Sequence, residues 1–207
     1  MHGTGVRAGA IKLGGRNPEL SAAEQKAFRA GARAQRATGV HITTHCTKYG
    51  GESSQLELLD AEGVDLARCV IGHTHEHLID PEVRQTCLAW MRRGANFLPT
   101  NLGIDRQRSP SEPPPSVARG GGAEEWRPLV EAIHQVFDAG LGGQLCFGLD
   151  FSFVSESAPF GPCSFLPPPP YIHLFSHTLP ALRAVGLTPA EEDAILRANP
   201  QRIIPVQ

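Results

Sequence analysis

The alternation of strand-like and helix-like segments constrains the fold of this chain more than any other feature. Short apolar runs recur along the sequence, and stretches of helical composition lie in the intervals between them. The strand-like runs are residues 6–12, 40–45, 69–73 and 145–150, with a weaker run at 95–99. Strands that alternate with helices pair in parallel. The sequence therefore predicts an α/β fold with about five parallel strands and their helices.

Several helix boundaries are marked by capping residues. Ser21 and Glu24 have the spacing of a capping box, and Gly39 suits the end of the Ala-rich helix that follows. Asp80, with a proline directly after it, predicts the start of another helix. Thr188 begins a second capping box near the end of the chain. These signals place helices in the intervals between the strands.

Two long segments interrupt the alternation. Residues 108–123 are rich in Pro, Gly and Ser, and residues 151–170 end in four consecutive prolines. Segments of this composition cannot pack a core, yet the strand and helix order resumes after the first of them. We therefore expect two long loops within one domain that covers residues 1–207.

Composition excludes several classes of partner. The 19 basic and 21 acidic residues nearly cancel, which argues against a nucleic-acid groove or a membrane-binding face. No apolar run approaches the roughly 18 residues that a membrane span needs, and the first residues lack the pattern of a signal peptide. The five cysteines are odd in number and form no CxxC pair, which favours reduced core thiols. We expect a soluble cytoplasmic protein.

Each of the four main runs ends on a side chain that a hydrolytic metal centre would use. These residues are Lys12, His45, His73 and Asp150. Parallel arrays of this kind keep their chemistry at the carboxyl ends of the strands. A carboxylate at the end of an apolar strand also needs a cation or a hydrogen-bonding partner. The four residues are therefore our candidate metal site.

Each of these residues also has a purely structural explanation. His45 taken alone is well explained as a hydrogen-bonded core histidine, and Asp150 as a helix N-cap. Lys12 can extend its ammonium to the rim, although burial would lower its pKa and leave a reactive amine. Further along the chain, His75 and His77 are interpreted as loop residues near the strand ends, where either could contact a metal or substrate.

Taken in order, the motifs resemble those of the phosphotriesterase family within the amidohydrolase superfamily. The matching segments are Gly5–Lys12 for its fourth strand, Thr43–His45 for its fifth, Val70–His73 for its sixth, Gly148–Asp150 for its eighth, and Asn199–Ile204 for its closing Asn-Pro-x-Arg motif. Together they span nearly the whole chain. The resemblance implies a partial TIM-type (β/α) barrel that lacks the N-terminal strands.

The resemblance also implies a metal-dependent hydrolase with two divalent ions, usually zinc. Lys12 would be the carboxylated lysine that bridges both ions, His45 and His73 would bind the more exposed ion, and Asp150 would bind the buried one. The implied reaction is attack by a metal-bridging hydroxide on an ester-type bond. Asp150 would then carry the proton away, so that Lys12 and Asp150 are the candidate catalytic residues.

The implied substrates are small molecules: phosphotriesters or other organophosphates, lactones and related esters. Residues 101–123 and 151–170 would form the variable wall of the pocket. Only eleven residues precede Lys12, whereas the family's His-x-His pair ends a first strand far upstream of its bridging lysine. We therefore expect the C-terminal part of a hydrolase, with only one ion well ligated. Its exposed strand edges would favour association, such as a homodimer.

Two other functions remain open at this point. The chain could be a non-catalytic protein: either a homologue that binds a single metal through His45 and His73, or a scaffold that completes itself with another chain. It could also be a one-metal amidohydrolase, of a deaminase-like or dipeptidase-like kind, in which Lys12 is not carboxylated.

Overall fold

The computed structural model describes residues 5, 8–100, 102, 123–149 and 174–204. Asp150 lies outside the described residues, as do residues 108–122 and 151–170, for which long loops are predicted.

The described strands form one parallel sheet, which confirms the predicted α/β class. They are β1 (Ala10–Gly15), β2 (His41–Cys46), β3 (Cys69–Gly72) and β4 (Asn96–Leu98), in the spatial order β1-β2-β3-β4. Neighbours in the sheet are thus neighbours in sequence, and helices connect them. This is the repeating unit of a (β/α) barrel.

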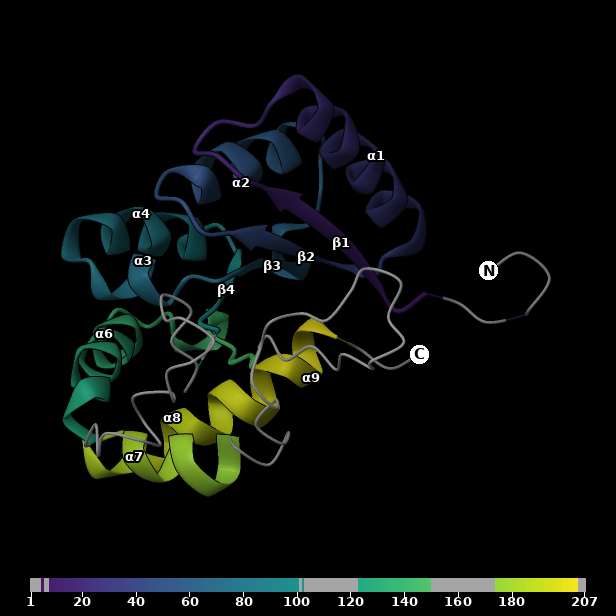
Figure 1. The fold of residues 1–207 in the computed structure, drawn as a ribbon. Coiled ribbons are helices and arrows are strands. Elements are labelled where there is room, and N and C mark those ends of the chain that lie inside the picture. Colours follow the sequence, from purple (N-terminus) through teal and green to yellow (C-terminus); the bar gives the residue numbers. More distant parts are fainter. Residues whose placement is uncertain (1–4, 6–7, 101, 103–122, 150–173, 205–207) are drawn as a thin grey trace, which may run out of the picture.

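Helices occupy the intervals between the strands and the C-terminal third of the chain. They are α1 (Ala22–Thr38), α2 (Gly51–Ala61), α3 (His75–Ile79), α4 (Pro81–Arg92), α6 (Arg127–Asp138), α7 (Leu179–Ala184), α8 (Pro189–Asp193) and α9 (Asn199–Ile203). Short 3-10 turns lie at Leu66–Arg68, Ala123–Trp126 and Gly142–Gln144, and π-helical turns at Leu174–Thr178 and Ala194–Ala198. Figure 1 shows α1, α2 and α4 along one side of the sheet, and α6 to α9 beyond β4.

The predicted caps are present. Ser21 donates its backbone N–H to Glu24 at 2.8 Å, and its hydroxyl accepts from the Glu24 N–H at 3.3 Å. Gly39 ends α1 in the left-handed conformation, with φ of 72°. The Asp80 carboxylate caps α4, and Thr188 forms the second capping box at α8. Local sequence therefore determines where these helices begin and end.

The two faces of the sheet differ in burial. Register pairs Lys12 with Thr43 and His45 with Gly72, so these positions share one face. On the opposite face Ile42 and Ile71 are completely buried against the helices. The main hydrophobic core therefore lies between the sheet and its helices, and the side chains of Lys12, Thr43 and His45 stay partly or largely exposed. The face that carries Lys12, Thr43 and His45 corresponds to the interior of a barrel.

The strand predicted at 145–150 is only partly formed within the described residues. Leu145 makes an isolated parallel bridge to Phe97, and the Gly148 N–H donates to the Pro99 carbonyl at 3.0 Å. Because Pro99 has no N–H, it cannot donate the next hydrogen bond of the parallel ladder. The first strand also lies later than predicted: β1 ends at Gly15 rather than at Lys12.

The chain's last helix is tied to the beginnings of the strands. The Asn199 side-chain amide donates to the carbonyls of Gly142 and Leu145, at 2.8 and 2.7 Å. Arg202 donates to the Asn96 side chain at 2.8 Å and to the Gly143 carbonyl at 2.7 Å. The Asn-Pro-x-Arg motif therefore closes the end of the sheet opposite to the candidate site.

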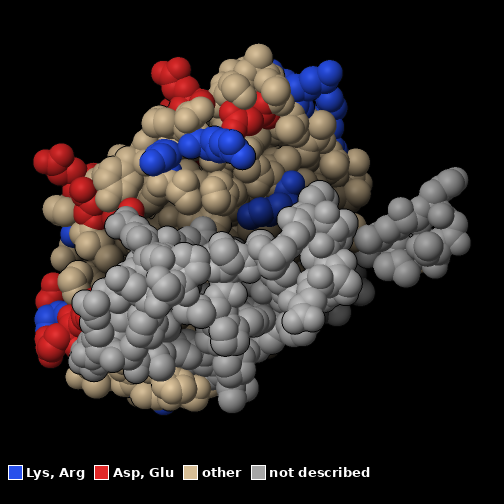
Figure 2. All heavy atoms as spheres, viewed as in Figure 1, with Lys and Arg blue, Asp and Glu red and all other residues tan. Residues whose placement is uncertain are grey.

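In the described part of the face that Figure 2 shows, charged residues of one sign do not gather into a single patch. Lysines and arginines occur there beside aspartates and glutamates in the described part of the surface. Among the described residues, no helix is long and apolar enough to cross a membrane.

Candidate metal centre

His45 and His73 meet at the carboxyl ends of two adjacent strands. His45 is the fifth residue of β2 and lies opposite Gly72 in register, and His73 follows β3 directly. Their rings pack edge to face with centroids 4.5 Å apart. A Cβ at Gly72 would lie 2.6 Å from the Thr44 carbonyl oxygen, so glycine is required for this close approach of the strands. The two imidazoles thus converge on one small region.

The conformation of His73 is specified by its surroundings. Its backbone has φ of 64°, a region that non-glycine residues rarely adopt. Its Nδ1 shares a 2.7 Å hydrogen bond with the buried Thr100 hydroxyl, and the whole residue is 7% exposed. When Nδ1 carries the proton of that bond, Nε2 presents the lone pair that a metal needs.

His45 is held through its backbone. The side-chain amide of Gln55, in α2, donates to the His45 carbonyl at 3.0 Å. The sheet register then directs the His45 side chain to the same face as Lys12 and Thr43. Contacts from a neighbouring helix therefore support the end of β2.

Lys12 lies on the same face, one pleat before His45 on the adjacent strand. Strand geometry puts the two Cα atoms about 8 Å apart, a distance that long side chains can span. The Lys12 side chain is largely exposed, yet surrounding protein removes part of its water and lowers the pKa of the ammonium below its ordinary value. The lowered pKa increases the share of neutral amine.

Three of the four predicted site residues are therefore placed on one face, with His45 and His73 at the carboxyl ends of β2 and β3 and Lys12 in the middle of the neighbouring β1. The fourth, Asp150, lies outside the described residues. The run that leads to it is described as far as Leu149, and it follows β4 from Leu145 onward. The two imidazoles can bind a divalent ion as they stand, whereas Lys12 can contribute only when its ammonium has lost its charge.

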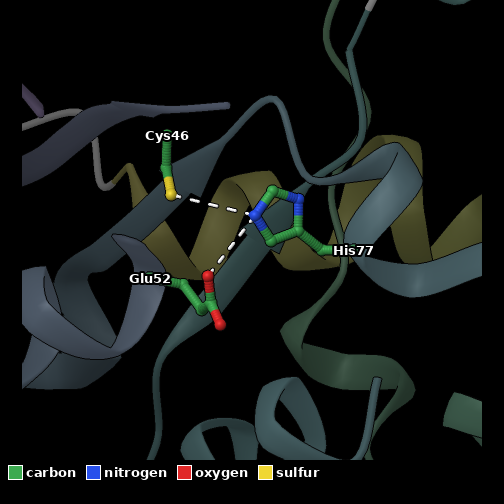
Figure 3. A group of neighbouring side chains, drawn as sticks. All are labelled: Cys46, Glu52 and His77. Carbon is green, nitrogen blue, oxygen red and sulfur yellow. Dashed lines mark hydrogen bonds and ion pairs between the residues drawn. The ribbon is translucent and has the colours of Figure 1, made fainter. Parts of the chain in front are cut away.

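The prediction that His75 and His77 are loop residues is wrong. Both lie in the short helix α3, and His77 is turned into the protein with 1% of its side chain exposed. It contacts Cys46 and Glu52 there (Figure 3). Sequence reasoning did not find this cluster. The available signal was strand alternation, which turns Cys46 to the face opposite to His45.

Burial makes Cys46 an unreactive thiol in the absence of a metal. Removal of water is the main cause that raises the pKa of the Cys46 thiol to about 12, and the nearby Glu52 carboxylate adds to the effect. A thiol with this pKa is protonated at neutral pH, so we do not interpret Cys46 as a nucleophile.

Comparison with known proteins identifies relatives along the whole chain. The family model described as "Phosphotriesterase family" matches residues 1–204. The phosphotriesterase homology protein of Escherichia coli is 27% identical over 206 residues, which cover 98% of this chain and 61% of that protein. The chain thus spans about three fifths of the length of this relative.

Solved structures of similar proteins have the same fold along nearly the whole chain. A structure of the phosphotriesterase homology protein from Escherichia coli, complexed with phosphate in its active site, matches with a TM-score of 0.72 and 26% identity. The match covers 99% of this chain and 62% of that chain. The organophosphorus hydrolase of Deinococcus radiodurans matches with a TM-score of 0.71 and 27% identity, over 99% and 57% of the two chains.

A mutant of a PTE-like lactonase from Deinococcus radiodurans is similar to the same degree. Its TM-score is 0.71 at 27% identity, and the match covers 99% of this chain and 59% of that chain. At this identity the resemblance extends beyond the fold to the sequence of nearly the whole described chain.

Proposed function

The chain belongs to the phosphotriesterase family, and from that premise we propose that it forms the metal-binding part of a hydrolase for ester-type bonds. The observation that carries the proposal is the convergence of the His45 and His73 rings, 4.5 Å apart at the strand ends. The substrate class follows the similar proteins, which include an organophosphorus hydrolase and a lactonase. Phosphotriesters and lactones are therefore the first substrates to test.

In this proposal Lys12, His45, His73 and Asp150 bind two divalent ions, of which zinc fits imidazole and oxygen ligands well. When bound, the ions lower the pKa of a shared water and polarise the bond that it attacks. The protein's own contribution is to position the ligands. Thr100 orients the His73 ring, and Gln55 fixes the backbone of His45.

Lys12 and Asp150 have the two chemical roles. The neutral amine of Lys12 would add to carbon dioxide and release a proton, which would give a carbamate whose oxygens could serve as metal ligands. Its lowered pKa supports this role because only the neutral amine reacts. Asp150 accepts the proton that the attacking water loses. The segments 101–123 and 151–170 form the pocket wall in this proposal.

Metal content is the primary test, because the chain spans about three fifths of the relatives' length and we expect weak turnover from it alone. We would measure zinc per chain and hydrolysis of a lactone and an aryl phosphotriester for the wild type, His45→Ala and Asp150→Asn. The matched control is His41→Ala, since His41 lies on the same strand and face about 13 Å away. We expect the two site variants to lose the zinc bound at the strand ends and any activity, and the control to keep both.

Full zinc content and full activity in both site variants would contradict the assignment. Mass spectrometry of Lys12 separates the proposal from the one-metal alternatives. The proposal requires the added mass of one carbon dioxide on Lys12 and two ions at the strand ends of each chain. A chain with one ion there, an unmodified Lys12 and no turnover would favour the non-catalytic homologue.

We further propose that the chain self-associates. Within the described residues β1 forms an edge of the sheet, and the face that carries Lys12 stays open. Unpaired strand edges favour pairing with a second chain. Size-exclusion chromatography with light scattering should give the mass of a dimer, and a monomer at all concentrations would contradict this.

A further inference from the structure

Three polar side chains meet in the core behind the candidate site, on the helix-covered side of the sheet. Cys46 is the last residue of β2, Glu52 is the second residue of α2, and His77 lies in α3. Each of the three side chains is about 1% exposed. Figure 3 shows the sulfur, the carboxylate and the imidazole turned toward one another. Three separate elements therefore contribute one potential ligand each.

The distances in this cluster are long for ordinary hydrogen bonds. His77 Nε2 lies 3.4 Å from Glu52 Oε2 and 4.0 Å from Cys46 Sγ. A buried imidazole and carboxylate that bond directly would approach to about 2.7–2.9 Å. Among the described residues, Glu52 Oε2 and His77 Nδ1 have no hydrogen-bond partner. A buried carboxylate oxygen that makes only this long contact to an imidazole is costly, which favours a cation at the centre of the cluster.

The same distances suit a tetrahedral metal ion. Zinc bonds of about 2.0–2.1 Å to nitrogen and oxygen separate two such ligands by about 3.3 Å, and the sulfur bond of about 2.3 Å separates sulfur from nitrogen by about 3.6 Å. The 3.4 Å between Nε2 and Oε2 already fits this arrangement. Cys46 Sγ would need to move by about 0.4 Å, which a change in its side-chain torsion can supply.

We propose that Cys46, Glu52 and His77 form a second metal site, separate from the one at the strand ends, for a zinc-like divalent ion. A thiolate and a carboxylate balance the two positive charges, so the filled site is neutral in the core. Thiolate and imidazole ligands favour zinc over magnesium or calcium. The Lys48 carbonyl, which accepts a hydrogen bond from Sγ at 3.7 Å, offers an oxygen for the fourth position.

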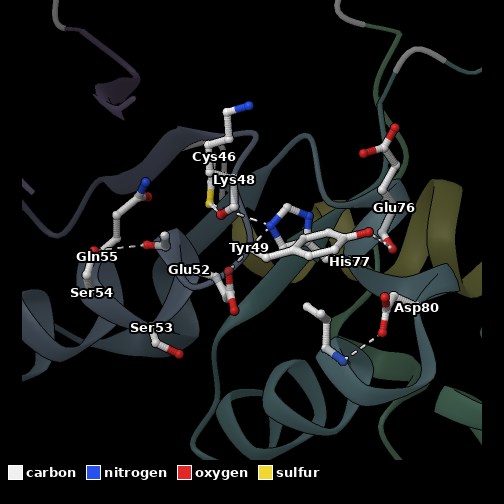
Figure 4. Close-up of polar contacts among 12 residues, drawn as sticks. Cys46, Lys48, Tyr49, Glu52, Ser53, Ser54, Gln55, Glu76, His77 and Asp80 are labelled. Atoms are coloured by element: carbon white, nitrogen blue, oxygen red, sulfur yellow. Dashed lines mark hydrogen bonds and ion pairs between the residues drawn. The ribbon is translucent and has the colours of Figure 1, made fainter. Parts of the chain in front are cut away.

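The surroundings isolate this site from water. The Tyr49 ring packs edge to face against His77 with centroids 5.0 Å apart, and Figure 4 shows it lying across the imidazole. Cys46 is adjacent to His45, and His77 lies four residues after His73. A bound ion would therefore connect β2, α2 and α3 directly behind the two histidines. Its role would be to fix the frame that positions them.

Cobalt provides a signature for this site alone, because a thiolate bound to cobalt absorbs strongly in the near ultraviolet. None of the ligands proposed at the strand ends carries sulfur. We would titrate the zinc-free full chain with cobalt chloride and follow that band in the wild type and in Cys46→Ser. The matched control is Cys69→Ser. Cys69 is also buried on the helix side of the sheet, and its thiol also donates to a backbone carbonyl, at 3.7 Å.

We expect the band to saturate at one sulfur-bound cobalt per chain. It should fall about tenfold or more at a given cobalt concentration in Cys46→Ser and His77→Gln, and remain in Cys69→Ser. Circular dichroism identifies variants that fail to fold, and His77→Gln then serves as the second test. Absence of the band in the wild type, or its survival in folded Cys46→Ser, would overturn the proposal.

The cobalt titration tests the Cys46, Glu52 and His77 site independently of the proposed hydrolase site. His45→Ala should leave the sulfur band unchanged while it removes metal from the strand ends. A band that persists in a protein whose strand-end residues bind no metal would count against the hydrolase proposal only. Loss of the band in His45→Ala would show that the sulfur belongs to the strand-end site and would overturn the second site.

Discussion

At the scale of single residues, His73 carries the most unusual conformation in the described chain. It is the one described non-glycine residue with positive φ, 64°, and it follows a glycine whose Cβ position is blocked by backbone. Strained conformations of this kind cost about 1–3 kcal/mol and persist where the surrounding structure enforces them. The sheet and Thr100 enforce it here, and the result is that His73 approaches His45.

Thr100→Val should weaken metal binding without unfolding the protein. The change removes the hydroxyl that fixes Nδ1 of His73, so the ring loses its preferred orientation and tautomer. We expect a loss of about 10–100-fold in zinc affinity, measured by competition with a chelating indicator. Thr100→Ser keeps the hydroxyl and should retain most of the affinity. Equal affinity in the valine variant would contradict a role for Thr100 in positioning His73.

Gly72→Ala should destabilise the sheet. The added Cβ would lie 2.6 Å from the Thr44 carbonyl oxygen, and backbone atoms cannot move aside as a flexible side chain can. We expect a loss of about 1–3 kcal/mol in the free energy of unfolding, measured with urea. Gly14→Ala is the matched control on the same face, because its Cβ would meet only the His45 Cβ at 3.4 Å. Similar losses of stability in the two variants would show that the close contact between Gly72 and the Thr44 backbone does not cause the destabilisation.

At the scale of elements, α9 holds the starts of the later strands together. Asn199 is buried and makes two hydrogen bonds to the carbonyls of Gly142 and Leu145. These bonds connect the C-terminal helix to the segment that runs beside β4. The fold there depends on a side chain that binds backbone, beside the apolar contacts of the buried Ile203.

Asn199→Ala should therefore destabilise the protein without changing metal affinity. Removal of the amide takes one hydrogen bond from each of two buried carbonyls and leaves that of Leu145 without this donor, which costs about 1–3 kcal/mol. Gln201→Ala, on the same helix but exposed, should change stability by less than about 0.5 kcal/mol. Urea unfolding measures both. A parallel loss of zinc affinity in Asn199→Ala would argue that the two ends of the sheet are coupled.

At the scale of the whole molecule, bound metal should contribute to stability. A ligand present at about 100 times its dissociation constant stabilises the folded state by about 2.7 kcal/mol. For a chain of this size each kcal/mol raises the melting temperature by about 2–4 °C. Zinc should therefore raise the melting temperature, and a chelator should reverse that increase. Differential scanning calorimetry measures both.

The double variant His45→Ala and Cys46→Ser removes a ligand from each of the two proposed sites. Zinc should raise the melting temperature of this double variant hardly at all, whereas it should raise that of His41→Ala as much as that of the wild type. If zinc raised the melting temperature of the double variant as much as that of the wild type, zinc would stabilise the chain through other residues.

The order of strands and helices, the capped ends of α1, α4 and α8, and the family could all be predicted from the amino-acid sequence. These features depend on neighbouring residues or on motifs in a fixed order, which a sequence displays directly. It also selected Lys12, His45 and His73 as residues of one face, because alternation in a strand is regular.

Only the tertiary structure decided how these residues meet. The 4.5 Å contact between His45 and His73 depends on sheet register and on the close approach of the Thr44 backbone to Gly72. The cluster of Cys46, Glu52 and His77 depends on how α2 and α3 pack. The interrupted ladder beside β4 depends likewise on the pairing of Gly148 with Pro99. Such contacts join residues far apart in the chain. Their distances follow from packing, which local composition does not encode.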